Sequence, residues 1–214
     1  MTPNFGVYLV TDAGLSGDRS TPEIVEAAVA GGVDVVQLRE KGTTARERYE
    51  LGTDLRALTR DAGVPLIVND RIDLAAAVDA DGVHLGDDDL PVSVARERLG
   101  PDAIVGRSVS TPSAAREAEA AGAVYLGVGA VYGTDSKDTS PEQSNVGLDR
   151  IRAVREATDL PFVGIGGVTP ENAAAVVEAG ADGVAVISAI TGADDPETAT
   201  PDLAAAVDGG AADV

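Results

Sequence analysis

Polar side chains that could bind a metal or take part in a reaction occur directly after several short apolar segments of this 214-residue chain. Asn69 and Asp70 follow one such segment, Asp89 comes shortly after the next, and Ser108 ends a third. Carboxylates at the ends of neighbouring strands are the hard oxygen ligands that Mg²⁺ takes, usually together with substrate phosphates. Asp70 and Asp89 are therefore predicted to hold one Mg²⁺. The alternative for either residue is a solvated surface charge, because acids are common in this chain.

The lysines form a second group, because the chain otherwise avoids lysine. Of its 16 basic residues only Lys41 and Lys137 are lysine, and all the others are arginine. Together with Arg39 and Mg²⁺, these cations are suited to neutralise a diphosphate, since lysine acts as a point charge and arginine as a fork on phosphate oxygens. Surface pairing with Asp or Glu is the alternative for Arg39 and the preferred interpretation for Arg107.

Two later segments predict a phosphate site. Gly166 and Gly167 precede Val168-Thr169-Pro170, where backbone amides at the start of a helix can approach an anion. Ser188 follows the last apolar segment and would supply the second half of the site, at the place where eight-stranded barrels often bind phosphate. The alternative is that the glycine pair only makes a tight turn.

Several kinds of nucleophilic and metal chemistry are excluded by composition. Cysteine is absent, so the chain has no disulfide, no thiolate nucleophile and no thiolate metal site. His84 is the only histidine, which excludes a His-rich metal site and any Ser–His pair that does not use it. His84 lies within the apolar segment Gly82-Val83-His84-Leu85-Gly86, and we interpret it as a core histidine with satisfied hydrogen bonds rather than a base.

The elements that position these residues follow a regular alternation. Segments rich in Val and Ile alternate with helical segments, whose starts resemble Thr169-Pro170-Glu171 and whose ends resemble Ala62-Gly63. Near-continuous apolar strands separated by helices favour a parallel sheet that is covered on its faces. Eight strands are expected, at about residues 7–11, 33–39, 65–69, 82–85, 104–108, 124–127, 162–165 and 183–187.

Eight such units in about 200 residues predict an α/β protein with a single-domain (β/α)8 TIM barrel. An open doubly wound sheet is the alternative, but it would usually carry Gly-x-Gly-x-x-Gly where this chain has Thr11-Asp12-Ala13-Gly14-Leu15-Ser16-Gly17. In a barrel, the C-terminal strand ends meet at one face and would gather the polar residues there. We expect residues 1–192 to form the catalytic barrel. Residues 193–214 would form an acidic Ala/Gly-rich helix, at about 201–207, with a frayed tail.

The charge of the chain restricts its partners. A net charge of −20 repels phosphate backbones, so no nucleic-acid partner is expected. Acids spread along the whole chain favour a surface adapted to high salt, where the Debye length falls to about 3 Å at 1 M. We see no secretory signal and no run of the ~18 apolar residues that a membrane helix needs. We therefore expect a soluble cytoplasmic protein without a membrane partner, and homo-oligomerisation stays open.

Taken in order, the segments resemble the thiamine-phosphate synthase (thiamine-phosphate pyrophosphorylase) family. The resemblance covers nearly the whole chain, from Tyr8-Leu9-Val10-Thr11-Asp12 to Val186-Ile187-Ser188-Ala189-Ile190. Each motif alone is weak, but the order and spacing together are strong. The most specific motifs are Val36-Gln37-Leu38-Arg39-Glu40-Lys41, Asn69-Asp70-Arg71, Gly127-x-Gly129 with Thr134-x-Ser136-Lys137, and Gly164-Ile165-Gly166-Gly167.

The resemblance implies a (β/α)8 barrel transferase of thiamine biosynthesis with two small-molecule substrates and one Mg²⁺ per subunit. That family joins hydroxymethylpyrimidine diphosphate to a thiazole phosphate, which gives thiamine phosphate and releases diphosphate. Lys41, Lys137 and Ser108 would be the catalytic residues. Carried over by position, the pyrimidine diphosphate would be held by Gln37, Leu38, Arg39, Glu40, Lys41, Asn69, Ser108 and Lys137, the thiazole phosphate by Thr134, Asp135, Ser136, Gly167, Ile187 and Ser188, and Mg²⁺ by Asp70 and Asp89.

Four positions depart from the family pattern. Asp87 stands where Gln is usual, Ser110 where His is usual, Gly133 where Pro is common, and Ser136 where Thr is common. A related barrel, the thiazole tautomerase, is believed to use a histidine at about the position of Ser110, so this departure argues against tautomerase activity. The remaining alternatives are another phosphate-handling barrel, such as a sugar-phosphate isomerase, and a non-catalytic binder of thiamine phosphate.

Overall fold

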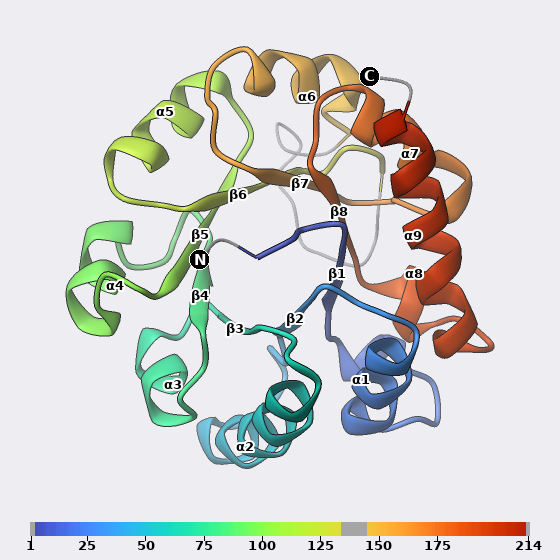
Figure 1. Ribbon diagram of the computed structural model, residues 1–214. Helices are drawn as coiled ribbons and strands as arrows, with labels where there is room; N and C mark the ends of the chain where they lie inside the picture. Colours follow the sequence, from blue (N-terminus) through green and yellow to red (C-terminus); the bar gives the residue numbers. More distant parts are fainter. Residues whose placement is uncertain (1–2, 134–144, 213–214) are drawn as a thin grey trace.

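The protein is a closed barrel of eight parallel strands, described here from a computed structural model that covers residues 3–133 and 145–212. Neighbouring strands pair in sequence order, and β1 pairs with β8 to close the ring. The helices surround the strands (Figure 1). The predicted single (β/α)8 barrel is therefore confirmed. Its strands are β1 (Val7–Val10), β2 (Val35–Leu38), β3 (Leu66–Asn69), β4 (Gly82–Leu85), β5 (Ile104–Val109), β6 (Tyr125–Gly129), β7 (Phe162–Ile165) and β8 (Gly183–Val186).

Several helices, among them α2, begin and end at the signals expected from the sequence. Before α2, the Glu47 amide donates to Thr44 Oγ1 at 3.2 Å and the Thr44 amide donates to the Glu47 carboxylate at 2.7 Å, which is a capping box. Gly63 ends α2 in the left-handed conformation, with φ of 72°. The helices are α1 (Thr21–Ala30), α2 (Ala45–Ala62), α3 (Ile72–Ala77), α4 (Val92–Leu99), α5 (Pro112–Ala120), α6 (Gly147–Arg155), α7 (Pro170–Glu178), α8 (Ser188–Thr191) and α9 (Pro196–Ala212), with a short 3₁₀ helix η1 (Ala13–Leu15) after β1.

Alternate residues of each strand contribute to two separate apolar cores. Val36 and Leu38 of β2 belong to the outer core between the strands and the helices. The inner core fills the barrel and contains Tyr8 and Tyr125, on which Phe5 stacks from the N-terminal segment. Because both faces of each strand pack in an apolar core, the strand sequences are continuously apolar and do not alternate between apolar and polar residues.

The C-terminal helix differs from its expected range. α9 extends beyond residues 201–207 at both ends, because Asp195 caps its start and Leu203 anchors its buried side. Near its end α9 approaches α7 so closely that a Cβ on Gly210 would lie 2.6 Å from the Ala174 carbonyl oxygen. The expectation of a short helix was wrong for this reason. No helix in the described ranges is both long and apolar enough to cross a membrane.

Candidate active site

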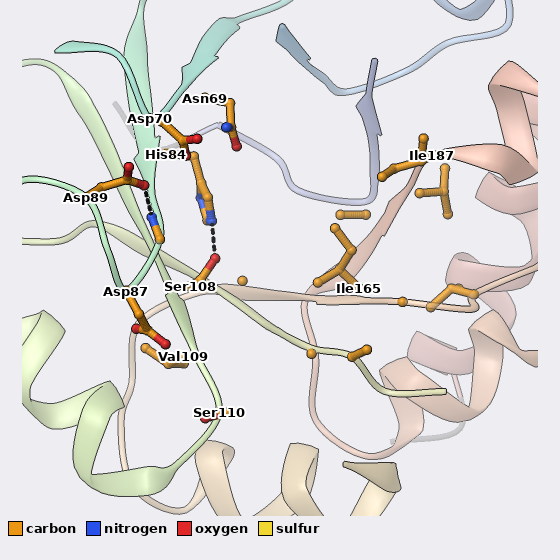
Figure 2. A pocket seen from close by; sticks show the side chains of 18 of the residues that line it. Asn69, Asp70, His84, Asp87, Asp89, Ser108, Val109, Ser110, Ile165 and Ile187 are labelled. Carbon is orange, nitrogen blue, oxygen red and sulfur yellow. Dashed lines mark hydrogen bonds between the residues drawn. The ribbon is translucent and has the colours of Figure 1, made fainter. Parts of the chain in front are cut away.

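A cavity of about 400 Å³ opens where the strands reach their C-terminal ends (Figure 2). Its lining comes from the segments that follow β2 to β8, so residues distant in sequence meet around one space. This volume lies within the usual range for small-molecule sites, about 300–1,000 Å³. The predicted site residues that line it are Lys41, Asn69, Asp70, Asp89, Ser108, Gly167, Ile187 and Ser188.

The two carboxylates predicted to hold Mg²⁺ lie next to each other beside Lys41. Lys41 Nζ is 3.2 Å from Asp70 Oδ2. Burial raises the pKa of Asp89, and contact with Asp70 raises it further, whereas the Gly86 amide, which donates to Asp89 Oδ2 at 2.6 Å, acts in the opposite direction. Within the described residues, no cluster of three or more His, Cys, Asp or Glu side chains could hold a metal. A carboxylate pair fits a Mg²⁺ ion that completes its shell with water and phosphate oxygens.

Asp70 lies in an uncommon backbone conformation, with φ of 65°. The Arg71 amide donates to the Asn69 carbonyl at 2.8 Å, which closes a three-residue turn around Asp70. The Asp70 amide is fixed in turn by the His84 carbonyl at 2.8 Å. A positive φ is strained for a residue with a Cβ, and such strain is often found at functional sites. The turn places Asn69 and Asp70 on the wall of the cavity.

Arg39 and Gln37, at the end of β2, face the inside of the barrel beneath this cavity. Both line a smaller space of about 20 Å³ that also touches Asn69 and Ser108. Arg39 Nη1 lies 2.7 Å from Asp12 Oδ2, and its Nε is buried without an acceptor among the described residues. Arg39 thus pairs with an Asp, as the alternative expected, but it is only 8% exposed, and its guanidinium has donor capacity left inside the barrel.

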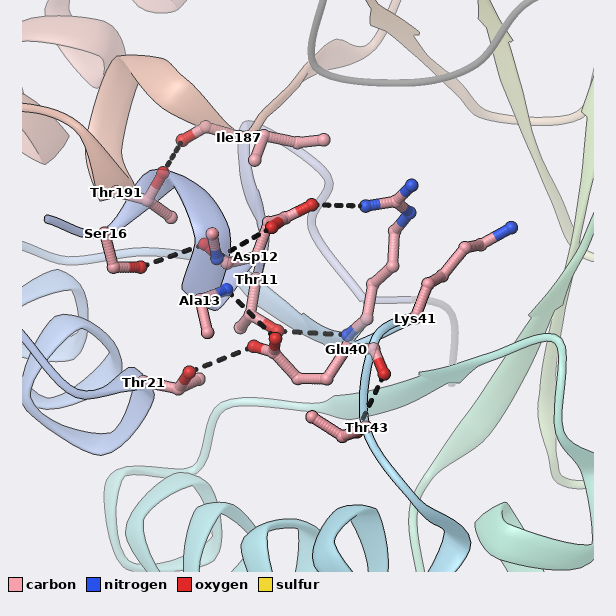
Figure 3. A network of polar contacts seen from close by, with 12 residues as sticks. Thr11, Asp12, Ala13, Ser16, Thr21, Glu40, Lys41, Thr43, Ile187 and Thr191 are labelled. Carbon is pink, nitrogen blue, oxygen red and sulfur yellow. Dashed lines mark hydrogen bonds and ion pairs between the residues drawn. The ribbon is translucent and has the colours of Figure 1, made fainter.

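The other two residues predicted in this segment turn their side chains away from the cavity. Leu38 packs in the outer core against Gly52 of α2. Glu40 accepts hydrogen bonds from the Ala13 amide and from Thr21 Oγ1, each at 2.9 Å (Figure 3). Because side chains alternate along an extended chain, a run of five consecutive residues cannot all face one ligand. Leu38 and Glu40 have only their backbones to offer a substrate, and the Glu40 side chain instead anchors the segment after β1.

Glycines form the opposite wall of the cavity, after β7. Gly166 and Gly167 have φ of 103° and 63°, and a Cβ on Gly167 would lie 2.7 Å from the Gly133 carbonyl oxygen. Asn172 of α7 holds this turn by donating to the Gly167 carbonyl at 3.0 Å. The turn is therefore fixed, and only glycine fits at Gly167. Four of the predicted site residues lie outside the described part of the chain: Thr134, Asp135, Ser136 and Lys137.

A buried chain of hydrogen bonds, which sequence reasoning missed, runs beneath the cavity. Gln37 Nε2 donates to the Tyr8 hydroxyl, which lies 2.8 Å from the Tyr125 hydroxyl. The Tyr125 hydroxyl lies 2.9 Å from His84 Nδ1, and His84 Nε2 lies 3.0 Å from Ser108 Oγ. The interpretation of His84 as a satisfied histidine is confirmed, but its ring also lines the cavity. The available signal was the presence of tyrosines inside apolar strands, because buried hydroxyls need partners.

Comparison with known proteins identifies the family. Residues 7–190 match the family model described as thiamine monophosphate synthase. The chain belongs to the thiamine monophosphate synthase family. The family resemblance inferred from the sequence is thus confirmed, and with it the prediction of a thiamine-phosphate synthase, a transferase of thiamine biosynthesis.

Relatives in the family are similar over their full length. A thiamine-phosphate synthase of Natronomonas pharaonis is 79% identical over 214 residues, which is all of both chains. A thiamine-phosphate synthase of Haloarcula marismortui is 65% identical over 97% of this chain and 99% of the relative. The solved structure of thiamine phosphate pyrophosphorylase from Pyrococcus furiosus is 41% identical, with a TM-score of 0.88 over 97% of this chain and 98% of that one.

Two of the four departures from the family pattern lie on the cavity wall. Asp87 and Ser110 line the cavity together with the residues described above. Arg107 Nη2 lies 3.2 Å from Asp87 Oδ1, and the Arg107 guanidinium also donates to the Gly86 carbonyl. The surface-pairing interpretation of Arg107 is confirmed by this ion pair. Asp87 thus adds a negative charge to the cavity wall, and Arg107 offsets it.

Proposed function

We propose that this family member joins hydroxymethylpyrimidine diphosphate to thiazole phosphate in a dissociative, Mg²⁺-assisted substitution. The observation that carries the proposal is the meeting of Asp70, Asp89 and Lys41 on one wall of the cavity, opposite the glycine turn at Gly166 and Gly167. In this proposal, one wall would bind a diphosphate through Lys41 and a carboxylate-held Mg²⁺, and the other would bind a second phosphate through its backbone.

The first wall is proposed to bind the pyrimidine diphosphate. Asp70 and Asp89 would hold Mg²⁺, which when bound stabilises the negative charge on a leaving diphosphate. Lys41 already contacts Asp70 and is 55% exposed at its side chain, so it can turn to a diphosphate oxygen. Asn69 and Ser108 line the same wall and supply uncharged hydrogen-bonding groups. Lys137, a prediction from the sequence, would add a second ammonium group.

The chemistry asks little of the protein beyond binding and alignment. The reacting carbon is benzylic to an aminopyrimidine, so its C–O bond can break early and the electron pair leaves with diphosphate. The ring amine delocalises the resulting cation, and the lone pair of the thiazole nitrogen then forms the new C–N bond. No protein nucleophile or strong base is needed, in agreement with a chain that lacks Cys and has one His. Electrostatic stabilisation and orientation supply the rate.

The second wall is proposed to align the thiazole phosphate. Amides of the Gly166–Gly167 turn and of the start of α8 at Ser188 present donors rather than charges to the phosphate. Thr134, Asp135 and Ser136 remain predicted partners of this phosphate. Binding by backbone fixes the position of the thiazole ring without placing a further cation next to the developing carbocation.

The remaining expectations concern the surroundings of the enzyme. We propose that the acidic surface is an adaptation to high salt, since a net charge of −20 would otherwise destabilise the compact state by self-repulsion. A cytoplasmic location and the absence of a nucleic-acid partner stay predictions, and homo-oligomerisation stays open.

Product formation across a salt series tests the proposal. The purified protein is incubated with both substrates, with Mg²⁺ or with a chelator, and thiamine phosphate and diphosphate are quantified. We expect equal amounts of both products with Mg²⁺ and little of either with the chelator. The absence of thiamine phosphate at every salt concentration would overturn the proposal. Turnover of one phosphorylated substrate alone would indicate an isomerase or tautomerase, and binding of thiamine phosphate without turnover would indicate a sensor.

A further inference from the structure

The buried hydrogen-bond chain connects the end of β2 to the cavity wall at β5. Its members are Gln37, Tyr8, Tyr125, His84 and Ser108, with successive distances of 2.8, 2.8, 2.9 and 3.0 Å. The first four side chains are at most 8% exposed, so bulk water does not compete for their donors and acceptors. The Ser108 hydroxyl is the end of this hydrogen-bond chain that reaches the cavity where Asp70 lies (Figure 2). Lys41 lines the same cavity.

Counting protons shows which group donates in each hydrogen bond of this buried chain. The Gln37 amide nitrogen can only donate, so the Tyr8 oxygen accepts. The Tyr8 hydroxyl then donates a hydrogen bond to the Tyr125 oxygen, and the Tyr125 hydroxyl donates one to His84 Nδ1. Burial raises the pKa of both phenols, so each hydroxyl keeps its single proton at neutral pH. His84 is therefore protonated at Nε2 and donates to Ser108.

The opposite direction leaves a donor unsatisfied. If His84 donated from Nδ1, Tyr125 would donate to Tyr8, whose oxygen already accepts from Gln37. The Tyr8 proton would then have no acceptor in the hydrogen bonds of the described residues. A buried donor without a partner costs its full desolvation. Only a rotation of the Gln37 amide by 180° would make the reverse direction consistent, and that rotation would move the proton of His84 to Nδ1.

We propose that Tyr8, Tyr125 and His84 are positioning residues that make the Ser108 hydroxyl a hydrogen-bond donor toward the substrate. Because Ser108 accepts from His84, its proton is free to point into the cavity. The ligand atom it meets is a hydrogen-bond acceptor on the pyrimidine diphosphate, either an oxygen of the leaving group or a ring nitrogen. The assignment of this substrate rests on the proposed function, whereas the direction of the chain does not.

The donor–acceptor direction of the hydrogen-bond chain can be measured in the ligand-free protein. His84 is the only histidine, so ¹⁵N-histidine labelling gives one pair of ring-nitrogen signals, which report the tautomer directly. We expect the proton on Nε2. A proton on Nδ1, or on both nitrogens, at neutral pH would overturn the proposal. This result is independent of whether the protein has any activity.

Hydroxyl deletions test the individual links. Tyr125→Phe removes the donor to Nδ1, so the Nε2 preference should decrease and a mixture of tautomers should appear. Tyr8→Phe removes the previous link and should have a smaller effect in the same direction, which keeps the test available if Tyr125→Phe does not fold. Tyr49→Phe deletes a hydroxyl on the exposed side of α2 and should leave the spectrum unchanged. Unchanged tautomers in both chain variants would overturn the proposal.

A double-mutant cycle separates positioning from packing. Tyr125→Phe should lower kcat/KM by about 5- to 10-fold, the effect of one neutral hydrogen bond. In a Ser108→Ala background the same change should alter kcat/KM by less than about twofold, because the hydroxyl it orients is gone. Equal losses in both backgrounds would show that Tyr125 acts through packing and would overturn the proposal. If the wild-type protein makes no thiamine phosphate, the proposed function fails, but the tautomer measurement still decides the direction of the chain.

Binding of substrate fragments identifies the acceptor. Diphosphate with Mg²⁺, and separately the pyrimidine alcohol without phosphates, are titrated calorimetrically into the wild-type protein and Ser108→Ala. Donation to the leaving group predicts that Ser108→Ala weakens diphosphate binding by about 5- to 10-fold, and donation to the ring predicts the same loss for the alcohol. Undiminished binding of both fragments would overturn the donor role of Ser108.

Discussion

The two walls of the cavity use different parts of the polypeptide. The wall at the ends of β2 to β5 presents side chains, among them Lys41, Asp70, Asp89 and Ser108. The wall at the ends of β6 to β8 presents glycines, alanines, aliphatic residues and Ser188, and among the described residues no charged side chain lines it. Charge is therefore concentrated where a metal and a leaving group are proposed to bind, whereas the other wall is proposed to bind the thiazole phosphate through its backbone.

Each wall has its own structural requirement. Charged side chains need fixed neighbours, and the three-residue turn at Asp70 and the Gly86 amide on Asp89 provide them. A backbone wall needs close approach, which Gly167 allows because it has no Cβ. Substitutions on the first wall should therefore change catalysis and metal dependence, and those on the second should change affinity for the thiazole phosphate.

The largest effect is expected for Lys137→Ala, which tests whether the segment after β6 also contributes charge. Loss of an ammonium group next to the leaving diphosphate should lower kcat by about 10²- to 10³-fold. The melting temperature should change little, because the sequence predicts a loop position. Steady-state kinetics and thermal denaturation check this, with Arg46→Ala on α2 as a basic-residue control. Parallel losses of activity and melting temperature would contradict a catalytic role for Lys137.

A smaller loss is expected for Asp70→Asn on the first wall. Asparagine tolerates the positive φ at this position, so the fold should survive while one Mg²⁺ ligand loses its charge. The Mg²⁺ concentration for half-maximal rate should rise about 10- to 100-fold. Asp79→Asn is the matched control, since Asp79 has φ of 53° and pairs with Arg60 on the surface. An unchanged Mg²⁺ titration for Asp70→Asn would show that the metal is held elsewhere.

On the second wall, Gly167→Ala should act on one substrate only. The added Cβ would meet the Gly133 carbonyl oxygen and distort the turn, so the KM for thiazole phosphate should rise about 10-fold while the KM for the pyrimidine diphosphate stays nearly constant. Gly63→Ala is the control, because its φ of 72° imposes a similar backbone cost of about 1 kcal/mol in open space. A rise in both KM values would contradict the division of the cavity into two walls.

The smallest effect concerns Asp89 and pH. Its raised pKa means that the ionised carboxyl is disfavoured in the folded protein without metal. The free energy of unfolding should therefore fall as pH rises from the ordinary carboxyl pKa to the raised pKa of Asp89. Asp89→Asn keeps an oxygen for the Gly86 amide and removes the charge, so the metal-free melting temperature at neutral pH should rise by about 1–3 °C.

Mg²⁺ and a neighbouring substitution complete that test. Added Mg²⁺ should stabilise the wild-type protein but not Asp89→Asn. Thermal denaturation between about pH 4 and pH 8, which begins near the ordinary carboxyl pKa, measures this difference. Asp88→Asn on the same exposed loop serves as the control. A lower melting temperature for Asp89→Asn in the absence of metal would contradict repulsion between the two carboxylates.

The outer architecture was predictable because it depends on local chemistry. Apolar segments, Thr-Pro helix starts such as Thr169-Pro170 and glycine stops such as Gly63 repeat along the chain, and all eight expected strands are present. The C-terminal helix was underestimated, because its ends are set by packing on α7 and by the Asp195 cap rather than by periodicity.

Several residues that line the cavity were also predictable, but the orientation of the side chains at the end of β2 was not. The sequence by itself determined the fold class, the family and the identity of the carboxylate pair, since these depend on the order of local patterns along the chain. Only the tertiary structure decided that Gln37 and Arg39 face inward while Leu38 and Glu40 face outward. Strands buried on both faces carry no alternation that distinguishes the two sides.

The meeting of Tyr8 with Tyr125 likewise depends on closure of the barrel. The two residues are 117 positions apart, on β1 and β6, and nothing local to either strand indicates that their hydroxyls lie 2.8 Å apart. Closure brings them together because inward-pointing side chains of all eight strands share one interior. Local patterns thus specify which elements form, and long-range packing specifies which polar groups meet inside them.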